Sequence, residues 1–410
     1  MRTILHSDLN NFYASCECLL HPEYNGKPLV VCGKIEDRHG IVLAKNLLAK
    51  QGGVKTGMTI YECKKIFPDI VTVLAHHDLY LEYSKKVKNI YKDYTNYIES
   101  FGIDEAWLDV TESVKRFGSG EQIAQEIRRR VKEEIGLTVS IGVSFNKVFA
   151  KLGSDLKKPD AVTVISEQNY KNLVWPLPVE DLLFVGRATK KKLNDLGIKT
   201  IGGLARFDLG ILKAKFGKIG EKLWVYANGL DKETVKKYTD EDEIKSVGNS
   251  LTFYRDIYEH EEVEMLFYYL AESVSERMKS YSLPFAKTVH ITIIDKELEH
   301  FSYQCPLKVA TSASSVIASS AMELFKKHIN VKIGIRGVGV SVSNFVDNEQ
   351  LMFGEAQDKK DKNVKLDQTM EQLRGRFGKT IIDRALIMKD ERLSQINTAT
   401  TSINSKNVPD

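Results

Sequence analysis

Apolar residues in the first 166 positions switch repeatedly between the short runs typical of strands and the three- or four-residue spacing typical of helices. Short runs predict strands at 1–11, 29–33, 40–46, 101–110 and 137–144. Helices are predicted over 12–20, within 54–67, over 80–98, and from a capping box formed by Ser119 and Gln122. This alternation predicts a sheet with helices on one face and acidic residues at the ends of strands.

The next stretch, residues 167–230, contains two pairs of short helical segments, each around a glycine turn. The first turn holds Gly186 and is followed by Lys190; the second holds Gly217 and Gly220. Tight glycine turns expose backbone N–H groups, and helix N-termini add positive dipole, so such hairpins suit phosphate oxygens. The same pattern also fits an ordinary helical hairpin with capping glycines.

The rest of the chain divides by composition. Residues 231–245 are almost all polar or charged, which predicts a linker. Residues 246–346 predict a compact α+β domain with a four-stranded sheet. Residues 347–410 predict a partly flexible tail, with one short helix near 365–388 where Met370, Leu373, Phe377 and Ile381 have helical spacing.

Composition narrows the class of protein. A chain of 410 residues is expected to form two to four domains. No apolar run reaches the roughly 18 residues of a membrane helix, so a cytoplasmic protein with no membrane partner is expected. Five cysteines without paired CxxC spacing argue against a disulfide framework or a zinc site. The net charge is only +4, but residues 166–238 hold 14 Lys or Arg against 8 Asp or Glu, an excess of six.

Three acidic residues lie in apolar, strand-like surroundings: Asp8, and the adjacent Asp104 and Glu105. A carboxylate in an apolar strand is costly unless it is paired, hydrogen-bonded or bound to a cation. Any one of them could be a turn or capping acid. Brought together by the fold, all three would suit two Mg²⁺ ions about 3.5–4 Å apart, the arrangement used in phosphoryl transfer.

Five blocks of the sequence carry a resemblance to a known family. They are HSDLNNFYASCE, FGIDEAWLDVT, SIGVSFNKVFAKLGSDLKKPD, the helix-hairpin-helix region and KSVGNSLTF. Over residues 1–345 their order and spacing resemble those of Y-family (DinB/UmuC-type) translesion DNA polymerases. The resemblance implies an α+β multidomain, right-hand polymerase, with the domains listed here: a ferredoxin-like palm (1–11 and 75–166), small fingers (12–74), a helix-hairpin-helix thumb (167–230), the linker 231–245 and an α+β little finger (246–346).

The resemblance also assigns roles to residues at the nucleotide site. Asp8, Asp104 and Glu105 match the catalytic metal-binding acids, with the backbone carbonyl of Leu9 as a further ligand of two Mg²⁺ ions, which Mn²⁺ can replace. Tyr13 matches the steric gate that excludes a ribose 2′-hydroxyl, next to Phe12, for which simple core packing is the alternative. Lys158 matches the lysine that grips the triphosphate, with Lys157 as the alternative register.

One part of the fingers departs from the family pattern. Where the family has NYxAR, with Tyr and Arg binding the triphosphate, this chain has Asn46, Leu47, Leu48, Ala49 and Lys50. Leu47 cannot donate a hydrogen bond, and Lys50 keeps the charge but loses the bidentate fork of arginine. Lys45 is a candidate to compensate. Weaker dNTP binding than is typical of the family is therefore expected.

Further partners also follow from the resemblance. Primer–template DNA is expected to contact the hairpins through Gly186, Lys190, Gly217 and Gly220, and the little finger through Arg336. Gln350, Leu351 and Phe353, in QLMF, look like a shortened sliding-clamp-binding peptide; an ordinary linker is the alternative. The family further implies a monomer with low fidelity, no proofreading and bypass of damaged template bases.

Two other functions fit part of the pattern. Nucleotide cyclases also place two-metal acids on a palm-like sheet, but they would leave the hairpins and the last domain unexplained. A non-catalytic DNA-binding scaffold would explain the hairpins but not three acids in apolar surroundings. Primer extension with Mg²⁺ and dNTPs separates these alternatives from a polymerase.

Overall fold

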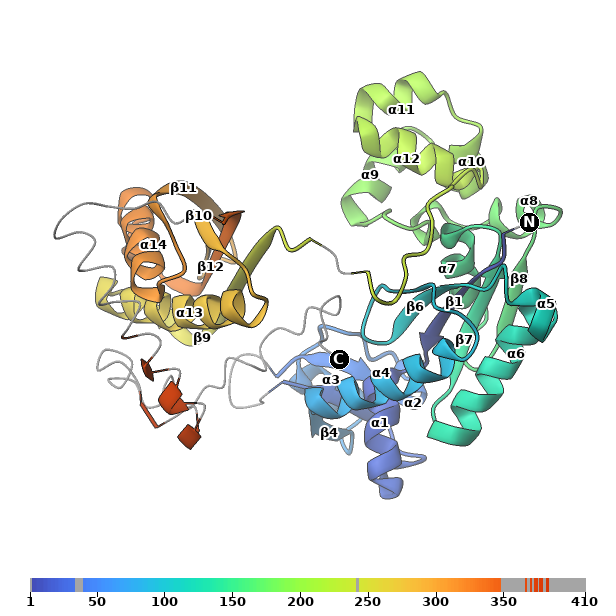
Figure 1. Cartoon of the computed structure of the whole chain (residues 1–410), viewed down its shortest axis with the longest axis horizontal. Coiled ribbons are helices and arrows are strands. Elements are labelled where there is room, and N and C mark those ends of the chain that lie inside the picture. The colour runs from blue at the N-terminus through green and yellow to red at the C-terminus, as the bar shows by residue number, and fades with distance from the viewer. Residues whose placement is uncertain are drawn as a thin grey trace. The chain divides into compact units, whose positions relative to one another are not determined.

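A computed structural model describes residues 2–33, 40–240 and 243–347, and positions 366, 369–370, 372–374, 376–378 and 381–382 of the tail. Two compact units result. Residues 2–33 and 41–240 form the first, and residues 243–347 with the tail positions form the second (Figure 1).

A five-stranded sheet with the order β5-β6-β1-β7-β8 forms the palm of the first unit. Its strands are β1 (Ile4–Leu9), β5 (Ile98–Ser100), β6 (Glu105–Asp109), β7 (Val139–Ser144) and β8 (Val162–Ile165). The central strand β1 pairs antiparallel with β6 and with β7. Five of its six residues are buried, because the sheet is covered on both faces.

Helices cover both faces of this sheet, so the sequence-based expectation of one covered face was wrong. Leu5 packs with Ile123 and Ile127 of α6 (Gly120–Arg130), on the face that α4 (His77–Lys92) also covers. The preceding residue, Ile4, points the other way and packs with Ala150 of α7 (Lys147–Leu156). Helix α7 comes so close to β7 that a Cβ on Gly142 would lie 1.9 Å from the Ala150 carbonyl oxygen. The smaller α5 (Val114–Phe117) and η2 (Val131–Ile135) flank α6.

Two further expectations from the sequence need correction. Helix α4 ends at Lys92, not near 98, because the chain turns there and Thr95 Oγ1 donates to the Asp109 carbonyl, which places Ile98 in β5. Asp104 is not in a strand: it immediately precedes β6, in the turn that Phe101 closes by donating its N–H to the Glu105 carbonyl.

The fingers are built on a three-stranded sheet with the order β3-β2-β4. Its strands are β2 (Leu29–Cys32), β3 (Val42–Lys45) and β4 (Val71–Leu74), and its helical segments are α1 (Phe12–Leu20), η1 (Pro22–Tyr24), α2 (Leu47–Gln51) and α3 (Ile60–Ile66). Val30, Val42, Ala49 and Ile60 share one small buried core. Leu29 and Val31 pack into the core of the palm instead, so both faces of the LVVC strand are apolar.

The thumb is entirely helical and shares a core with α7 of the palm, through Phe149 and Leu223 among others. Its helical segments are α8 (Tyr170–Val174), η3 (Val179–Asp181), α9 (Arg187–Asp195), α10 (Ile201–Ala205), α11 (Leu209–Phe216) and α12 (Lys218–Ala227) (Figure 1). The glycine turns that the sequence indicates lie at the starts of α9 and α12.

The first ten residues of the charged stretch 231–245 lie against the palm. The backbone N–H of Lys236 donates to Glu99 Oε2 (3.1 Å), and that of Tyr238 donates to the Asn96 carbonyl (2.9 Å), both beside the edge strand β5. Val235 is buried in a cluster with Ile4, Trp107 and Ala150. We call residues 231–240 the palm strap. The apolar side chain of Val235 and the backbone hydrogen bonds are enough to hold the palm strap against the palm. The polar composition of residues 231–245 does not reveal these contacts.

The second unit is the α+β little finger, with one four-stranded sheet of order β11-β10-β12-β9, as the sequence predicts. Its elements are β9 (Ser246–Ile257), α13 (His260–Ser280), β10 (Phe285–Asp295), β11 (His300–Thr311), α14 (Ser314–His328), η4 (Val331–Ile333) and β12 (Ile335–Val346). Both helices supply buried residues to the core under the sheet. In the tail, described positions between 366 and 377 are helical, and the Arg374 guanidinium contacts Glu272 of α13 at 3.1 Å.

Replacing Val235 with Asp should release the palm strap, because it puts an unpaired charge into an apolar cluster. We expect the free energy of unfolding to fall by about 2 kcal/mol or more. Thr234→Asp adds the same charge at the neighbouring exposed position and should change stability little. Urea unfolding of both variants measures the difference; equal effects would contradict the buried role of Val235.

Candidate active site

Two of the three acids face each other on neighbouring strands. In the β1–β6 register, Asp8 is directly opposite Glu105. Residues opposite each other in an antiparallel pair project to the same face of the sheet, which here is the face of His6. Asp104 joins them from the β5–β6 turn, where its carbonyl oxygen accepts a hydrogen bond from the Leu9 N–H (3.0 Å).

The closeness of the three acids affects their pKa values. Burial, together with the charges of Asp8 and Glu105, raises the pKa of Asp104 to about 6. Burial also raises the pKa of Asp8, against the opposing effect of Lys158. Burial disfavours the charge on Glu105 as well, but the His6 and Lys151 contacts outweigh it and hold its pKa at about 2. The group therefore concentrates negative charge that the protein only partly balances.

Two lysines provide the balancing positive charge. Lys158 Nζ is 2.8 Å from Asp8 Oδ2 and 2.8 Å from Asp155 Oδ1. Lys151 Nζ is 2.5 Å from Glu105 Oε2. The geometry favours Lys158 over Lys157 as the lysine of the site, because it is Lys158 that reaches the acids.

Sequence reasoning missed His6 and Lys151. The buried His6 ring has Nδ1 2.9 Å from Ser154 Oγ and Nε2 3.4 Å from Glu105 Oε2. Alternation along β1 could have indicated His6, which is two residues before Asp8 and so on the same face. Lys151 and Ser154 share a face of α7, but only the tertiary packing of α7 on the sheet shows that this face meets Glu105.

The loop that carries Lys158 is fixed by its neighbour Asp160. Asp160 adopts a φ of 54° and donates its N–H to Asn10 Oδ1 (2.8 Å). Its carboxylate accepts from Arg128 and Lys132, both at 2.8 Å. The loop is thus tied both to the start of α1, two residues beyond Asp8, and to α6.

Tyr13 and Phe12 differ in burial in the structure. Phe12 is 4% exposed and belongs to the palm core, which supports the packing alternative for that residue. Tyr13 is half-buried, and its ring stacks on that of Tyr80 with centroids 4.1 Å apart and planes 12° apart. Burial and the charge of Asp104 raise the pKa of the Tyr13 hydroxyl.

In the fingers, Asn46 is structural: its side chain caps α2 by accepting from Ala49 N–H and bonds to the backbone of Lys27 and Leu29. Leu47 and Lys50 are exposed on α2. Lys45 is half-buried with Nζ 3.0 Å from Thr56 Oγ1, and burial together with the Lys50 charge lowers its pKa. Lys45 and Lys50 thus form a local cluster of positive charge.

The thumb glycines differ in what they do. No heavy atom lies within 4 Å of a Cβ built on Gly186 or on Gly217, which has a φ of +61°, so both present open backbone at helix starts. Gly220 is buried, and a Cβ there would lie 2.3 Å from the Leu212 carbonyl oxygen; it packs α12 on α11. Lys190 pairs with Glu180 at 2.6 Å.

Arg336 is half-buried in β12 of the second unit, apart from the unit that holds the acids. The clamp-peptide residues Gln350, Leu351 and Phe353 lie outside the described residues. In the part of the chain that the structure describes, no helix is long and apolar enough to cross a membrane.

The donor set of the acids fits a hard divalent cation. Carboxylate and carbonyl oxygens are the ligands that Mg²⁺ prefers, and the raised pKa of Asp104 shows an uncompensated buried charge that a cation would relieve. Among the described residues no three His, Cys, Asp or Glu side chains converge on one point. Asp8 and Glu105 contact Lys158 and Lys151 instead, so a cation here would compete with two ammonium groups.

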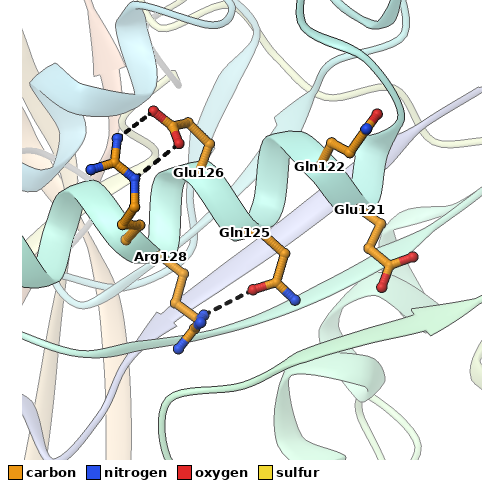
Figure 2. A pocket seen from close by; sticks show the side chains of 6 residues that line it. Glu121, Gln122, Gln125, Glu126 and Arg128 are labelled. Carbon is orange, nitrogen blue, oxygen red and sulfur yellow. Dashed lines mark hydrogen bonds and ion pairs between the residues drawn. The ribbon is translucent and has the colours of Figure 1, made fainter.

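A separate surface hollow of about 490 Å³ lies on α6, lined by Glu121, Gln122, Gln125, Glu126, Arg128 and Arg129 (Figure 2). Arg128 donates to Gln125 (3.0 Å) and Arg129 pairs with Glu126 (2.8 Å). Four of the six lining side chains thus pair with one another, and none of the predicted site residues lines the hollow.

Comparison with known proteins decides the family. The impB/mucB/samB family model matches residues 7–155, its C-terminal domain matches 244–353, and a DNA polymerase-iota thumb domain matches 180–231. DNA polymerase IV of Acetivibrio thermocellus is 50% identical over 398 residues, 96% of this chain and 100% of its own length. The chain belongs to the DNA polymerase IV group of Y-family polymerases. It is thus a DNA-directed DNA polymerase of the translesion class.

Other relatives agree. DNA polymerase IV of Moorella thermoacetica is 36% identical over 94% of this polymerase and 96% of its own length. The solved Y-family DNA polymerase chimera Dbh-Dpo4(243-245)-Dbh superposes with a TM-score of 0.74 at 25% identity, covering 84% of this chain and 100% of the chimera. The fold class predicted from the sequence is confirmed, and the cyclase and scaffold alternatives are excluded. A Y-family polymerase fold also implies dependence on a divalent metal.

The raised pKa of Asp104 makes stability depend on pH in a defined direction. Its ordinary value is 3.8 and its folded value about 6, so the ionised carboxylate destabilises the fold increasingly as pH rises from about 4 to 6, and fully above that. In EDTA, Asp104→Asn should raise the free energy of unfolding at pH 7.5 by about 3 kcal/mol and leave it nearly unchanged at pH 4.

The control for this prediction is Asp69→Asn, at an exposed acid of the fingers, which should have little effect at either pH. Denaturant unfolding at the two pH values measures all three proteins. An equal gain from Asp104→Asn at pH 4 and pH 7.5 would show that lost charge is not its cause.

Proposed function

We propose that the polymerase adds dNTPs to a primer 3′-hydroxyl by a two-metal mechanism, with Mg²⁺ held by Asp8, Asp104, Glu105 and the Leu9 carbonyl. The observation that carries the proposal is the register pair of Asp8 and Glu105, with Asp104 beside them and its pKa raised by burial and by their charges. Mn²⁺ has similar ligand preferences and can replace Mg²⁺.

The bound cations would supply charge that lowers the pKa of the primer hydroxyl and neutralises the triphosphate. The residues supply position. The three acids hold the cations at the end of β1 and β6. Lys158, whose ammonium group is already beside Asp8, binds the triphosphate as a point charge. The Asp160 contacts keep its loop in place.

Tyr13 selects the sugar in this proposal. One face of its ring is covered by Tyr80, and the half-buried remainder is free to lie against the incoming nucleotide. A 2′-hydroxyl would collide with the ring, so deoxynucleotides are preferred by steric exclusion.

Template and primer bind through contacts that carry no sequence preference. The open backbone at Gly186 and Gly217, together with Lys190 and Arg336, supports phosphate binding. Gly220 serves through packing. Low fidelity, absence of proofreading and bypass of damaged bases complete the proposal, with a cytoplasmic monomer that recruits a sliding clamp through Gln350, Leu351 and Phe353.

Primer extension tests the catalytic proposal. With Mg²⁺ and dNTPs the parent should extend a primer, and Asp104→Ala should lose roughly 10³-fold or more in rate, because it removes one of the proposed cation ligands. Glu112→Ala, at an exposed acid of the palm, should extend normally. Binding of Mn²⁺, followed by electron paramagnetic resonance, should fall in Asp104→Ala only. Extension by Asp104→Ala at the parental rate would refute the assignment.

The departure in the fingers predicts weak nucleotide binding. Lys45 and Lys50 offer charge, but Leu47 offers no donor, and lysine cannot form the bidentate contact of arginine. Leu47→Tyr with Lys50→Arg should lower the KM for dNTP by roughly 5-fold, as expected for one or two added hydrogen bonds. Leu48→Tyr with Lys50→Arg puts the same ring on the adjacent, equally exposed residue. Steady-state insertion kinetics compare them; an unchanged KM in the first variant would count against the idea.

A further inference from the structure

A buried carboxylate lies behind the nucleotide site and takes no part in it. Glu17, one turn of α1 after Tyr13, is 0% exposed. Its Oε1 accepts a hydrogen bond from the Tyr80 hydroxyl (2.5 Å) and is 2.9 Å from His76 Nδ1. Its Oε2 is buried and has no hydrogen-bond partner among the described residues. A carboxylate so placed costs stability, so packing alone gives no reason for it.

The partner of Glu17 is the ring beneath Tyr13. Tyr80 is 0% exposed, and its ring is stacked on Tyr13 with centroids 4.1 Å apart and planes 12° apart. The His77 ring meets both tyrosines edge-on, 6.0 Å from each centroid. Phe12 tilts against the same pair. Tyr13 is therefore held from below by one flat ring, which other rings surround.

The Glu17 contact fixes that flat ring. A tyrosine ring held only by apolar neighbours can slide in its plane and tilt, whereas a charge-assisted bond at the hydroxyl fixes its far end. The short bond from Tyr80 to Glu17 joins α4 to α1, the helix that also carries Tyr13. The contacts therefore run from Tyr13 to Tyr80 and from Tyr80 to Glu17, and Glu17 lies on the same helix α1 as Tyr13.

We propose that Glu17 is a positioning residue for sugar selection: by fixing Tyr80, it holds the Tyr13 ring where a ribose 2′-hydroxyl cannot fit. The inference rests on the proposed function, in which Tyr13 excludes ribonucleotides. Steric exclusion of one hydroxyl depends on displacements below 1 Å, so a platform free to shift would admit the larger sugar while still accepting the smaller one.

A purely structural Glu17 would behave differently. If it only stabilised the packing of α1 on α4, its loss would lower stability and reduce deoxynucleotide and ribonucleotide insertion together. A positioning role changes the ratio between them. The informative quantity is therefore kcat/KM for a dNTP divided by kcat/KM for the matching rNTP, measured by single-nucleotide insertion on one primer–template.

Four single variants and one double variant test the contacts from Tyr13 through Tyr80 to Glu17. Glu17→Ala and Tyr80→Phe each remove the same bond and should each lower the ratio roughly 5- to 20-fold. Because they share that bond, the double variant should be no worse than the worse single variant. Glu17→Gln should keep a ratio near the parent's, since its amide oxygen still accepts from Tyr80. Tyr83→Phe removes a hydroxyl of the same helix α4 that makes no hydrogen bond to Glu17 among the described residues, and it should leave the ratio unchanged.

Tyr13→Ala separates this inference from the proposed function. If it destroys discrimination while Glu17→Ala and Tyr80→Phe retain the parental ratio, Tyr13 is the gate and the role of Glu17 is overturned. If Tyr13→Ala itself discriminates as the parent does, the proposed gate fails. Tyr80→Phe keeps the stacked ring, so it provides the test even if Glu17→Ala does not fold, which thermal unfolding would reveal. Additive losses in the double variant would also overturn the proposal.

Discussion

The burial of negative charge at the end of β1 and β6 is the constraint on which the rest of the first unit depends. Asp8 and Glu105 are opposite each other by register, and Asp104 is added by the adjoining turn. Burial and the mutual repulsion of these carboxylates oppose ionisation, and both raise the pKa of Asp104. The fold tolerates them because Lys151 reaches in from the middle of α7 and Lys158 from the loop that follows this helix.

Helix α7 joins the three acids to the rest of the unit. Three residues of α7 contact three different partners. Ser154 contacts His6, Lys151 contacts Glu105, and the buried Lys147 binds both carboxylate oxygens of Glu99 at 2.8 Å. Glu99 in turn accepts from the palm strap. Gly142 lets α7 approach closely enough for all these contacts. A change in the seating of α7 would therefore reach both the acids and the strap.

The sequence could indicate the acids because a carboxylate in an apolar run is anomalous, whereas Tyr13 is assigned through the resemblance of the HSDLNNFYASCE block to the family. The end of α4 could not be predicted from the sequence. Tyr94 and Ile98 are buried in the palm core although they lie beyond the helix, so their apolar spacing resembles a continuation of it. His6, Lys151 and the strap were invisible for a related reason. Each acquires its role from a partner more than 40 residues away, and composition contains no record of that pairing.

The residues proposed to contact the sugar and those proposed to contact the triphosphate differ in how firmly the fold holds them. Tyr13 lies on Tyr80 and, through it, on a buried carboxylate, so the sugar contact belongs to the palm core. Leu47 and Lys50 project from a five-residue helix with exposed side chains. A core position is constrained by every neighbour it touches, whereas an exposed one can be exchanged at small cost in stability. The triphosphate grip is thus where this polymerase could depart from its family without disturbing the fold, and sugar selection is where it could not.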